Sequence, residues 1–341
     1  MSELARILAE ARDRRVFSGA AWSVGSPDGV VDSGWIGSRW WGGPGLNGED
    51  LWDLASVTKP VVGLAVMALA ERGALGIEET IADHLPEYRG GDKATVTIGQ
   101  LLAHTSGLPG KVPLYRDNPT REALLRAVRN LPLRAAPGER VEYSSQGFII
   151  LGLIAEAAAG KPLDALVDEL VCTPIGMTRT GFNPPAAQRK TAVATEKCPW
   201  RGRVVRGEVH DENAVVLGGI GGHAGLFAPL SDLERLGRAL ADHGTGLLSP
   251  DTFARMTACH TDGLALRRGL AWQGLDPSVS PVGQAPGPDS FGHTGFTGTS
   301  IWVDPATRRY FVLLTNRVHP SRENAAIEPV RRRFHDAAVA F

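Results

Sequence analysis

The chain has 341 residues, of which 43% are hydrophobic and 21% charged, and its formal net charge is −1. This composition is typical of a folded globular protein and excludes a disordered chain. The near-neutral charge, with no long basic run, argues against nucleic acid or an anionic membrane as a partner. The three cysteines are widely spaced without a CxxC pattern, so we expect reduced thiols rather than a disulfide framework or a zinc site.

The first residues, MSELARILAEARDRR, have the pattern of a charged amphipathic helix and lack the order of a secretory signal. No apolar run reaches the length of a transmembrane helix. We therefore expect a cytoplasmic protein with no membrane partner. Residues 19–37 follow and predict two strands around a Pro-Asp-Gly turn.

Helices are predicted through the middle of the chain. Residues 57–72 are apolar nearly all round, which indicates a buried helix with Pro60 in its first turn. Region 174–216 is expected to be mostly irregular, and a helix is expected from an N-cap at Ser231 to Gly244. Further helices are predicted over residues 97–104, 120–130, 144–159 and 162–171.

The last third of the sequence predicts strands at residues 264–272, 299–305 and 308–316. A final helix is expected over residues 322–340, with the basic cluster Arg331-Arg332-Arg333 as a solvated face. Since strands are predicted at both ends and helices between them, the simplest architecture is one sheet built from both termini with a helical insertion. Ser56 then lies at the seam between the two parts, a usual place for a pocket.

The stretch LASVTKP, residues 54–60, contains one of only six lysines, against thirty arginines. Lys59 follows Ser56 by three residues, so on a helix the two side chains share a face. A serine hydroxyl needs a base to become a nucleophile, and a buried lysine can release its proton near neutral pH whereas arginine cannot. The pair therefore predicts a nucleophile and its base at a helix N-terminus, although a helix cap beside a surface lysine would give the same pattern.

Two later motifs favour a nucleophile and its base over a helix cap beside a surface lysine. GERVEYSSQGFIILG, residues 138–152, contains Tyr143 and Ser145, and FGHTGFTGTSIWVDP, residues 291–305, contains His293-Thr294-Gly295 shortly before or at the start of a strand. With Ser56-x-x-Lys59 they resemble, in order, the three signatures of the superfamily of serine β-lactamases, penicillin-binding proteins and related esterases. LLAHTSGLPG (101–110) and VHDENAVVLGGIGGHAGLFAPLSDL (209–233) also look like this family, and the resemblance covers about residues 19 to 320.

The resemblance implies an α+β fold, with an antiparallel sheet flanked by helices and an inserted all-helical lobe. We expect a single domain over residues 1–341, with one lobe from about 1–55 plus 220–341 and the helical lobe over about 56–219. It implies an acyl ester on Ser56 and no metal or organic cofactor. Lys59 and Tyr143 would share the serine proton and return it to the leaving group. The backbone N–H groups of Ser56 and Phe296 would form the oxyanion hole, and the substrate would contact Ser145, His293, Thr294 and Gly295.

Two departures from the family pattern bear on the substrate. Ser145 stands where the family often has Asn, and His293, only partly charged at neutral pH, stands where it often has Lys. Both favour an esterase, amidase or acyl-transfer enzyme over a potent β-lactamase or a carboxylate-reading peptidase. His293 could also relay a proton near Tyr143, or be a structural residue at a strand end.

We therefore expect a serine hydrolase or transacylase acting on a small-molecule ester or amide, with an amine as a candidate acyl acceptor. The alternatives are a β-lactamase or D-alanyl-D-alanine carboxypeptidase, and a non-catalytic binding or sensor domain that keeps the fold. His104 and His223 are expected to fix loops through backbone hydrogen bonds, and VHDEN (209–213) to form a polar loop at the pocket mouth rather than a metal site.

Overall fold

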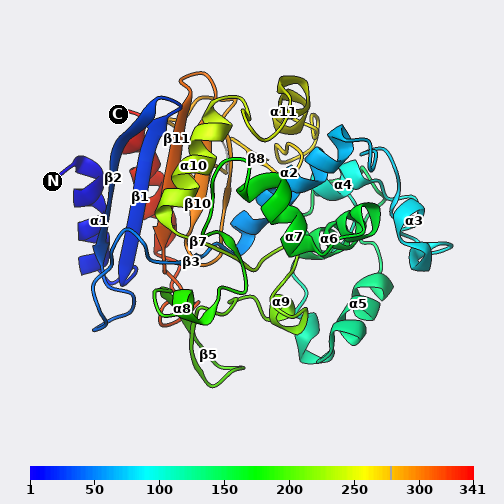
Figure 1. The fold of residues 1–341 in the computed structure, drawn as a ribbon, viewed down its shortest axis with the longest axis horizontal. Helices are drawn as coiled ribbons and strands as arrows, with labels where there is room; N and C mark the ends of the chain where they lie inside the picture. The colour runs from blue at the N-terminus through cyan, green and yellow to red at the C-terminus, as the bar shows by residue number, and fades with distance from the viewer. Residues whose placement is uncertain (277–278) are drawn as a thin grey trace.

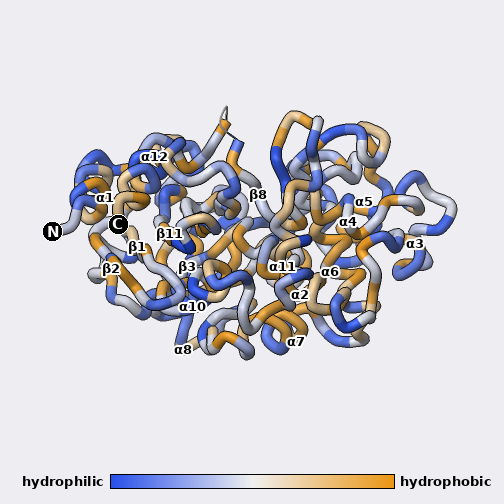
Figure 2. The backbone as a smooth tube through the Cα atoms, turned by 90° about the horizontal axis from the view of Figure 1, so that it is seen from above, coloured by the Kyte–Doolittle hydropathy of each residue, from blue (hydrophilic) through white to orange (hydrophobic). Residues whose placement is uncertain are grey.

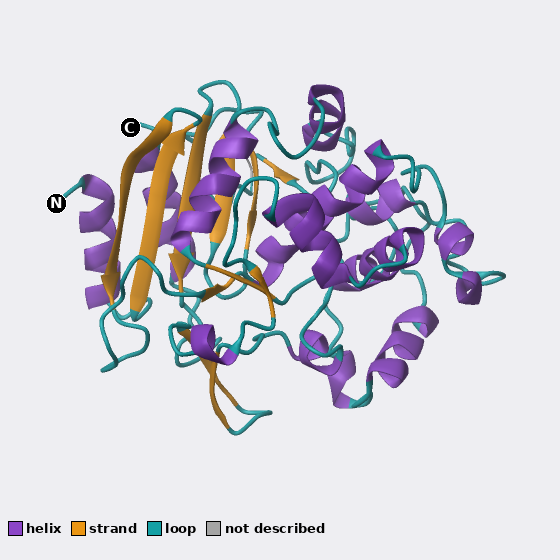
Figure 3. Cartoon of the chain, viewed as in Figure 1, coloured by secondary structure: helices purple, strands orange, loops and turns teal. Residues whose placement is uncertain are grey.

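The computed structural model describes residues 1–276 and 279–341 (Figure 1). A six-stranded sheet occupies one half of the molecule and helices fill the other (Figure 3). Its strand order is β2-β1-β11-β10-β9-β8, with the paired neighbours antiparallel, which confirms the predicted α+β fold. The strands are β1 (Gly19–Ser26), β2 (Gly29–Gly37), β8 (Gln273–Gly274), β9 (Phe291–Thr294), β10 (Ser300–Asp304) and β11 (Arg309–Thr315).

Both faces of this sheet are covered by helices. Helices α1 (Glu3–Asp13) and α12 (Ile327–Ala338) pack together on one face, and α10 (Leu230–Ala241) covers the other (Figure 1). Because side chains alternate along a strand, Phe311 and Leu313 of β11 face the α1 and α12 layer. Tyr310, Val312 and Leu314 instead belong to the larger core, which continues into the helical half.

The helical half is built around α2 (Thr58–Glu71) and α6 (Ser145–Ala159). Every residue of α2 from Thr58 to Leu69 is buried, as its uniformly apolar sequence predicts. Figure 2 shows hydrophobic stretches concentrated around these two helices. The surrounding helices are α3 (Ile81–His84), α4 (Ile98–Leu102), α5 (Arg121–Asn130), α7 (Leu163–Val167) and α11 (Pro250–Thr257), with single turns η2 (Pro86–Tyr88), η3 (Leu114–Arg116) and η4 (Asp168–Cys172).

The region expected to be irregular contains short elements that connect the two halves. A small sheet has the order β3-β7-β4, and β5 pairs with β6 in a hairpin. The N–H of Ala194 on β5 donates to the carbonyl of Arg39, so this region lies against the sheet half. The elements within residues 174–216 are β4 (Gly181–Phe182), α8 (Ala186–Arg189), β5 (Ala194–Cys198), β6 (Arg203–Arg206) and α9 (Glu212–Val216). The small sheet is completed by β3 (Trp52–Asp53) and β7 (Leu226–Ala228) from outside this region.

Two predictions for residues 230–272 were wrong, and one helix in this part of the chain was missed. Helix α10 begins at Leu230 after Pro229, not after an N-cap at Ser231. Residues 264–272 form bends with an isolated bridge between Arg268 and Gln273 rather than a strand. The Thr261 hydroxyl accepts the Arg268 N–H, and the Arg268 carbonyl accepts the His260 N–H. Helix α11 was not predicted at all.

The final helix begins at Ile327, five residues later than predicted. The guanidinium group of Arg317 donates to the carbonyls of Arg322 and Asn324, both at 2.9 Å. These two carbonyls are therefore not available to a helical ladder, and residues 322–326 stay outside α12. Within the described residues, no helix combines the length and apolarity needed to cross a membrane.

Candidate active site

Ser56 lies in a single 3₁₀ turn, η1 (Ala55–Val57), between β3 and α2. The carboxylate of the buried Asp53 accepts the N–H of Ala55 at 2.8 Å, and Ala55 has φ +47°, a conformation uncommon for a residue other than glycine. The Thr58 hydroxyl accepts the N–H of Leu226, which ties this turn to β7. The sharp turn leaves Ser56 partly exposed while its neighbours are buried.

Lys59 is fully buried beneath Ser56. Its Nζ atom donates to Ser56 Oγ at 3.2 Å and to the carbonyl of His223 at 2.9 Å. The same atom lies 4.9 Å from the ring centroid of Tyr143. Among the described residues, no carboxylate forms an ion pair with Lys59, so the position resembles a site for a base more than a structural ion pair.

Tyr143 lies just before α6, beside His104. The two rings are 4.7 Å apart, and His104 Nδ1 accepts the N–H of Ser144 at 3.1 Å. Burial lowers the pKa of His104 well below its usual value, so its ring is neutral and can accept this bond. His104 thus fixes the loop that carries Tyr143, as predicted. The Tyr143 hydroxyl is buried and has no hydrogen-bond partner in the described part of the chain.

His293 and Thr294 are the last two residues of β9, and Gly295 follows it. The motif lies shortly before β10, which begins at Ser300, and this is one of the two predicted positions. A Cβ atom on Gly295 would lie 2.1 Å from Thr299 Oγ1 and 2.5 Å from the carbonyl oxygen of Leu54, so only glycine fits here. The Thr299 hydroxyl also donates to the Leu54 carbonyl, at 3.0 Å. The turn after β9 is therefore held against the residues that precede Ser56.

This contact brings the backbone of Phe296 to the serine. The Thr297 hydroxyl donates to the Asp53 carbonyl at 2.8 Å, and the carbonyl of Phe296 accepts a bond from Arg317 Nε at 2.7 Å. The N–H of Phe296 makes no hydrogen bond within the described residues. It remains available as a donor, as the proposed oxyanion hole requires.

His293 is neutral in this environment, which corrects the expectation that it is partly charged. Burial first, and then the charges of Lys59 and Arg268, lower its pKa to about 3. Its Nδ1 donates to the carbonyl of Thr294 at 2.8 Å, and its ring lies 5.9 Å from that of Tyr143. His293 therefore cannot supply a fixed positive charge for a substrate.

Ser56 lies in the wall shared by two pockets. The first, of about 220 Å³, is also lined by Ser145 and by Asp211 of the VHDEN loop, as predicted for that loop. The second, of about 310 Å³, is lined by Tyr143, His293, Thr294 and Gly295. Lys111 and Phe296 line both pockets, and Lys111 Nζ lies 4.6 Å from the Phe296 ring. These two side chains divide the space around the serine.

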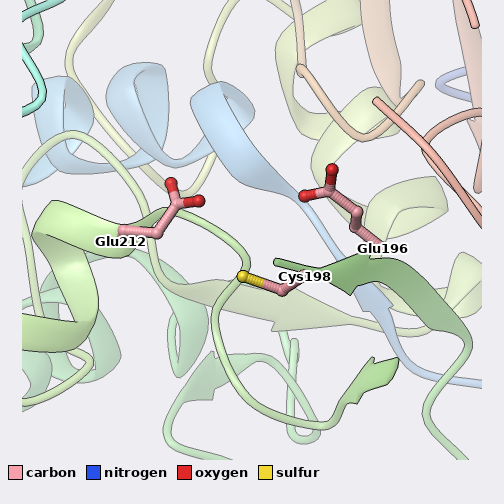
Figure 4. Close-up of side chains that lie close together, drawn as sticks. All are labelled: Glu196, Cys198 and Glu212. Carbon is pink, nitrogen blue, oxygen red and sulfur yellow. The ribbon is translucent and has the colours of Figure 1, made fainter. Parts of the chain in front are cut away.

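Glu196, Cys198 and Glu212 converge beside the first pocket, with their ligand atoms within 4.8 Å of one another (Figure 4). Arg322 occupies this cluster: its guanidinium donates to both oxygens of Glu196 at 2.6–2.8 Å and also binds Glu212. His210 Nε2 lies 2.9 Å from Glu196. Burial opposes ionisation of Glu196, but these partners outweigh it and lower its pKa to about 2. The cluster is an ion-pair network rather than a metal centre.

The sequence did not identify four cations that line the second pocket: Lys111, Arg268, Arg317 and Arg331. The prediction of a solvated face was wrong for Arg331, which is only 6% exposed, whereas Arg332 and Arg333 are exposed. The helical spacing of the apolar residues could have predicted that Arg331 is buried. Arg331 follows the buried Ile327 by four residues and precedes the buried Phe334 by three, so it shares their face.

An antiparallel sheet flanked by helices, with a Ser-x-x-Lys turn facing a tyrosine, defines the class of β-lactamase-type serine hydrolases. The Beta-lactamase family matches residues 4–334, and the chain belongs to this family. Over 304 residues it is 31% identical to an Escherichia coli (strain K12) protein provisionally named a D-alanyl-D-alanine carboxypeptidase. That alignment covers 79% of this chain and 69% of the relative.

Solved structures show the same fold. EstCE1, titled a hydrolase with promiscuous acyltransferase activity, is 22% identical with a TM-score of 0.81, and the match covers 98% of this chain and 97% of that one. Simvastatin synthase LovD from Aspergillus terreus is 18% identical with a TM-score of 0.78, covering 99% and 97% of the two chains. At these identities the likeness shows the fold alone.

Proposed function

We propose that the protein transfers acyl groups from small-molecule esters or amides through a covalent intermediate on Ser56. The observation that carries the proposal is the 3.2 Å contact between Lys59 Nζ and Ser56 Oγ, made by a lysine that is fully buried. Membership of the β-lactamase family supports hydrolase activity in general. The names of the structural neighbours, a hydrolase with acyltransferase activity and a synthase, are compatible with acyl transfer to a nucleophile other than water.

In the proposed reaction, Ser56 Oγ attacks the carbonyl carbon while its proton passes to Lys59 or Tyr143. The N–H groups of Ser56 and Phe296 stabilise the oxyanion that develops. When the bond to the leaving group breaks, Tyr143 donates the proton to it, and the acyl group remains as an ester on Ser56. Water, or an amine, then attacks this ester through the same groups in reverse.

Steady-state kinetics with p-nitrophenyl acetate test this proposal. We expect wild-type protein to release p-nitrophenol with turnover, and Ser56→Ala to lose the activity while keeping its melting temperature. Added amines that accelerate release and appear as amides in the product would assign transacylation. Equal rates for wild type and Ser56→Ala would overturn the proposal.

We also propose that the protein is cytoplasmic. We further propose that its two lobes meet at residues 55/56 and 219/220. Helix α11, which packs on α2, and the β5–β6 hairpin are the elements whose assignment to a lobe is least obvious from sequence order. Cell fractionation tests the location, and limited proteolysis near both boundaries tests the lobes.

A further inference from the structure

The loop that supplies a hydrogen-bond acceptor to Lys59 is rich in glycine. Five of the eight residues 218–225, GGIGGHAG, are glycine, and His223 is the one polar side chain among them. The carbonyl of His223 accepts a hydrogen bond from Lys59 Nζ at 2.9 Å. Because a glycine-rich backbone has many accessible conformations, the position of this carbonyl needs a further restraint.

That restraint is a hydrogen bond between the His223 side chain and Asp211. His223 is 1% exposed, and its Nε2 atom lies 2.9 Å from Asp211 Oδ1. Asp211 is itself held as the N-cap of α9, where the same oxygen accepts the N–H of Ala214 at 2.9 Å. The side chain of His223 therefore fixes the loop, as predicted, but through a carboxylate rather than through a backbone group.

Asp211 also contributes a negative charge near Lys59. Burial opposes ionisation of Asp211, but its interaction with His223, the N–H of Ala214 and the charge of Lys59 outweigh burial and lower its pKa below the ordinary value. Because an ionised carboxylate only accepts hydrogen bonds, His223 Nε2 is the donor of the pair. The attraction between Asp211 and Lys59 is mutual, so it favours the ammonium group that Lys59 forms when it takes a proton.

A second link joins the VHDEN loop to the nucleophile. The N–H of His210, the residue before Asp211, donates to the carboxylate of Asp53 at 2.7 Å. The other oxygen of this carboxylate accepts the N–H of Ala55, in the turn that carries Ser56. One loop is therefore tied both to the turn of the serine and, through Asp211, to the carbonyl that binds the lysine.

The next two side chains of the VHDEN loop have different partners. Glu212 pairs with Arg322, and Asn213 Nδ2 donates to the carbonyl of Val112 at 2.9 Å. These contacts join the loop to other segments without reaching Lys59. Asp211 differs from them because its partner, His223, is the residue whose carbonyl contacts the lysine.

We propose that Asp211 and His223 are positioning residues for Lys59, which hold the carbonyl that orients its amine toward Ser56. This inference rests on the proposed function, in which Lys59 takes the serine proton. A neutral lysine amine accepts that proton through its lone pair, while one of its N–H groups stays bonded to the His223 carbonyl. The carbonyl therefore sets the direction of the lone pair, and a base that points away from the hydroxyl reacts slowly.

Single-turnover acylation by p-nitrophenyl acetate tests this role, because it separates the rate constant at saturation from the half-saturating ester concentration. We expect Asp211→Asn and His223→Leu to lower the rate constant by at least about tenfold and to change the half-saturating concentration by less than about twofold. Asp211→Asn keeps an acceptor for the Ala214 N–H, so the cap of α9 is preserved. His223→Gln keeps an N–H donor for Asp211 and should recover most of the lost rate.

Asp232→Asn is the matched control. Asp232 is also buried and accepts two hydrogen bonds, from the N–H of Arg179 at 2.9 Å and from the hydroxyl of Thr180 at 2.8 Å. It is absent from the described lining of both pockets beside Ser56. This variant should lose stability in urea unfolding and keep the wild-type rate constant.

A double-mutant cycle distinguishes positioning of Lys59 from general support of the structure. In a Lys59→Met background, Asp211→Asn and His223→Leu should change the remaining rate by less than about twofold, because the base that they position is gone. Wild-type rate constants in both single variants, an effect confined to the half-saturating concentration, or an equal loss in the Lys59→Met background would overturn the proposal. Absence of an acyl adduct on Ser56 in the wild-type protein would instead refute the proposed function itself.

Discussion

The Nζ atom of Lys59 lies 3.2 Å from Ser56 Oγ, and the lysine that carries it is completely enclosed by protein. Lys59→Arg keeps a cation at this position but removes a group that can give up its proton. We expect kcat/KM for p-nitrophenyl acetate to fall by about 10²–10⁴-fold, the usual contribution of a general base. The matched control is Lys161→Arg, which changes an exposed lysine paired with Glu169 and should keep wild-type activity. Full activity of Lys59→Arg would refute the role of Lys59 as a base.

Tyr143→Phe separates catalysis from stability. The Tyr143 hydroxyl has no hydrogen-bond partner among the described residues, so its removal should change the free energy of unfolding by less than about 1 kcal/mol. Activity should fall by about 10²–10⁴-fold because the leaving group loses its proton donor. Urea unfolding and ester kinetics measure the two effects.

Tyr310→Phe is the control for this experiment. Its hydroxyl lies 3.3 Å from Ser23 Oγ, in the sheet half of the molecule. We expect this variant to lose about 1 kcal/mol of stability and to keep its activity. A Tyr143→Phe protein that is unstable but active would contradict the assigned role.

Gly295→Ala should disrupt the contact between the end of β9 and the turn before Ser56. The added Cβ would lie 2.1 Å from Thr299 Oγ1 and 2.5 Å from the Leu54 carbonyl oxygen, so the backbone must shift. We expect a loss of about 1–3 kcal/mol in stability together with a large fall in kcat, because Phe296 moves with the turn. Gly181→Ala on β4 meets nothing within 4 Å and should be tolerated. Equal behaviour of the two variants in thermal melting and kinetics would argue against the proposed oxyanion hole.

Stability should fall as the pH is lowered from 6.5 because several histidines are buried in the neutral form. Burial lowers the pKa of His335 to about 3, so between pH 6.5 and pH 3 the unfolded state binds a proton that the folded state does not. This group alone should reduce the free energy of unfolding by about 2 kcal/mol between pH 6.5 and pH 5. In His335→Leu that part of the pH dependence should disappear, and urea unfolding at several pH values measures it. If the free energy of unfolding of His335→Leu changed with pH as steeply as that of the wild type, His335 would already bind its proton in the folded wild-type protein.

Much of the fold could be predicted because the sequence pattern and the local structure agree. Helices α2 and α6 are apolar nearly all round and are buried nearly all round, and the β1–β2 hairpin follows its Pro-Asp-Gly turn. Residues 264–272 were predicted to form a strand because of their apolar residues, but the N–H and carbonyl of Arg268 are bonded to Thr261 and His260 instead. The start of α12 likewise depends on a side chain outside the helix, because Arg317 binds the carbonyls of Arg322 and Asn324.

Some residues of the candidate site could likewise be predicted from the sequence, and others could not. Ser56, Lys59, Tyr143 and His293 could be found because each belongs to a short motif with fixed spacing. The charge of His293 could not be predicted, because it is set by burial and by cations that are far apart in sequence. Arg268 and Arg331 belong to no motif, and they reach the pocket only through a turn before β8 and one face of α12.

The most direct test of the account is intact-mass spectrometry of the protein mixed with p-nitrophenyl acetate, followed by peptide mapping. We predict one acetyl adduct on wild-type protein, located on Ser56, that decays as p-nitrophenol continues to be released. Ser26→Ala, at the end of β1, should form the same adduct, and Ser56→Ala should form none. An adduct on another residue of the wild-type protein would contradict the central claim that Ser56 carries the acyl group. Turnover by Ser56→Ala at the wild-type rate would contradict it as well.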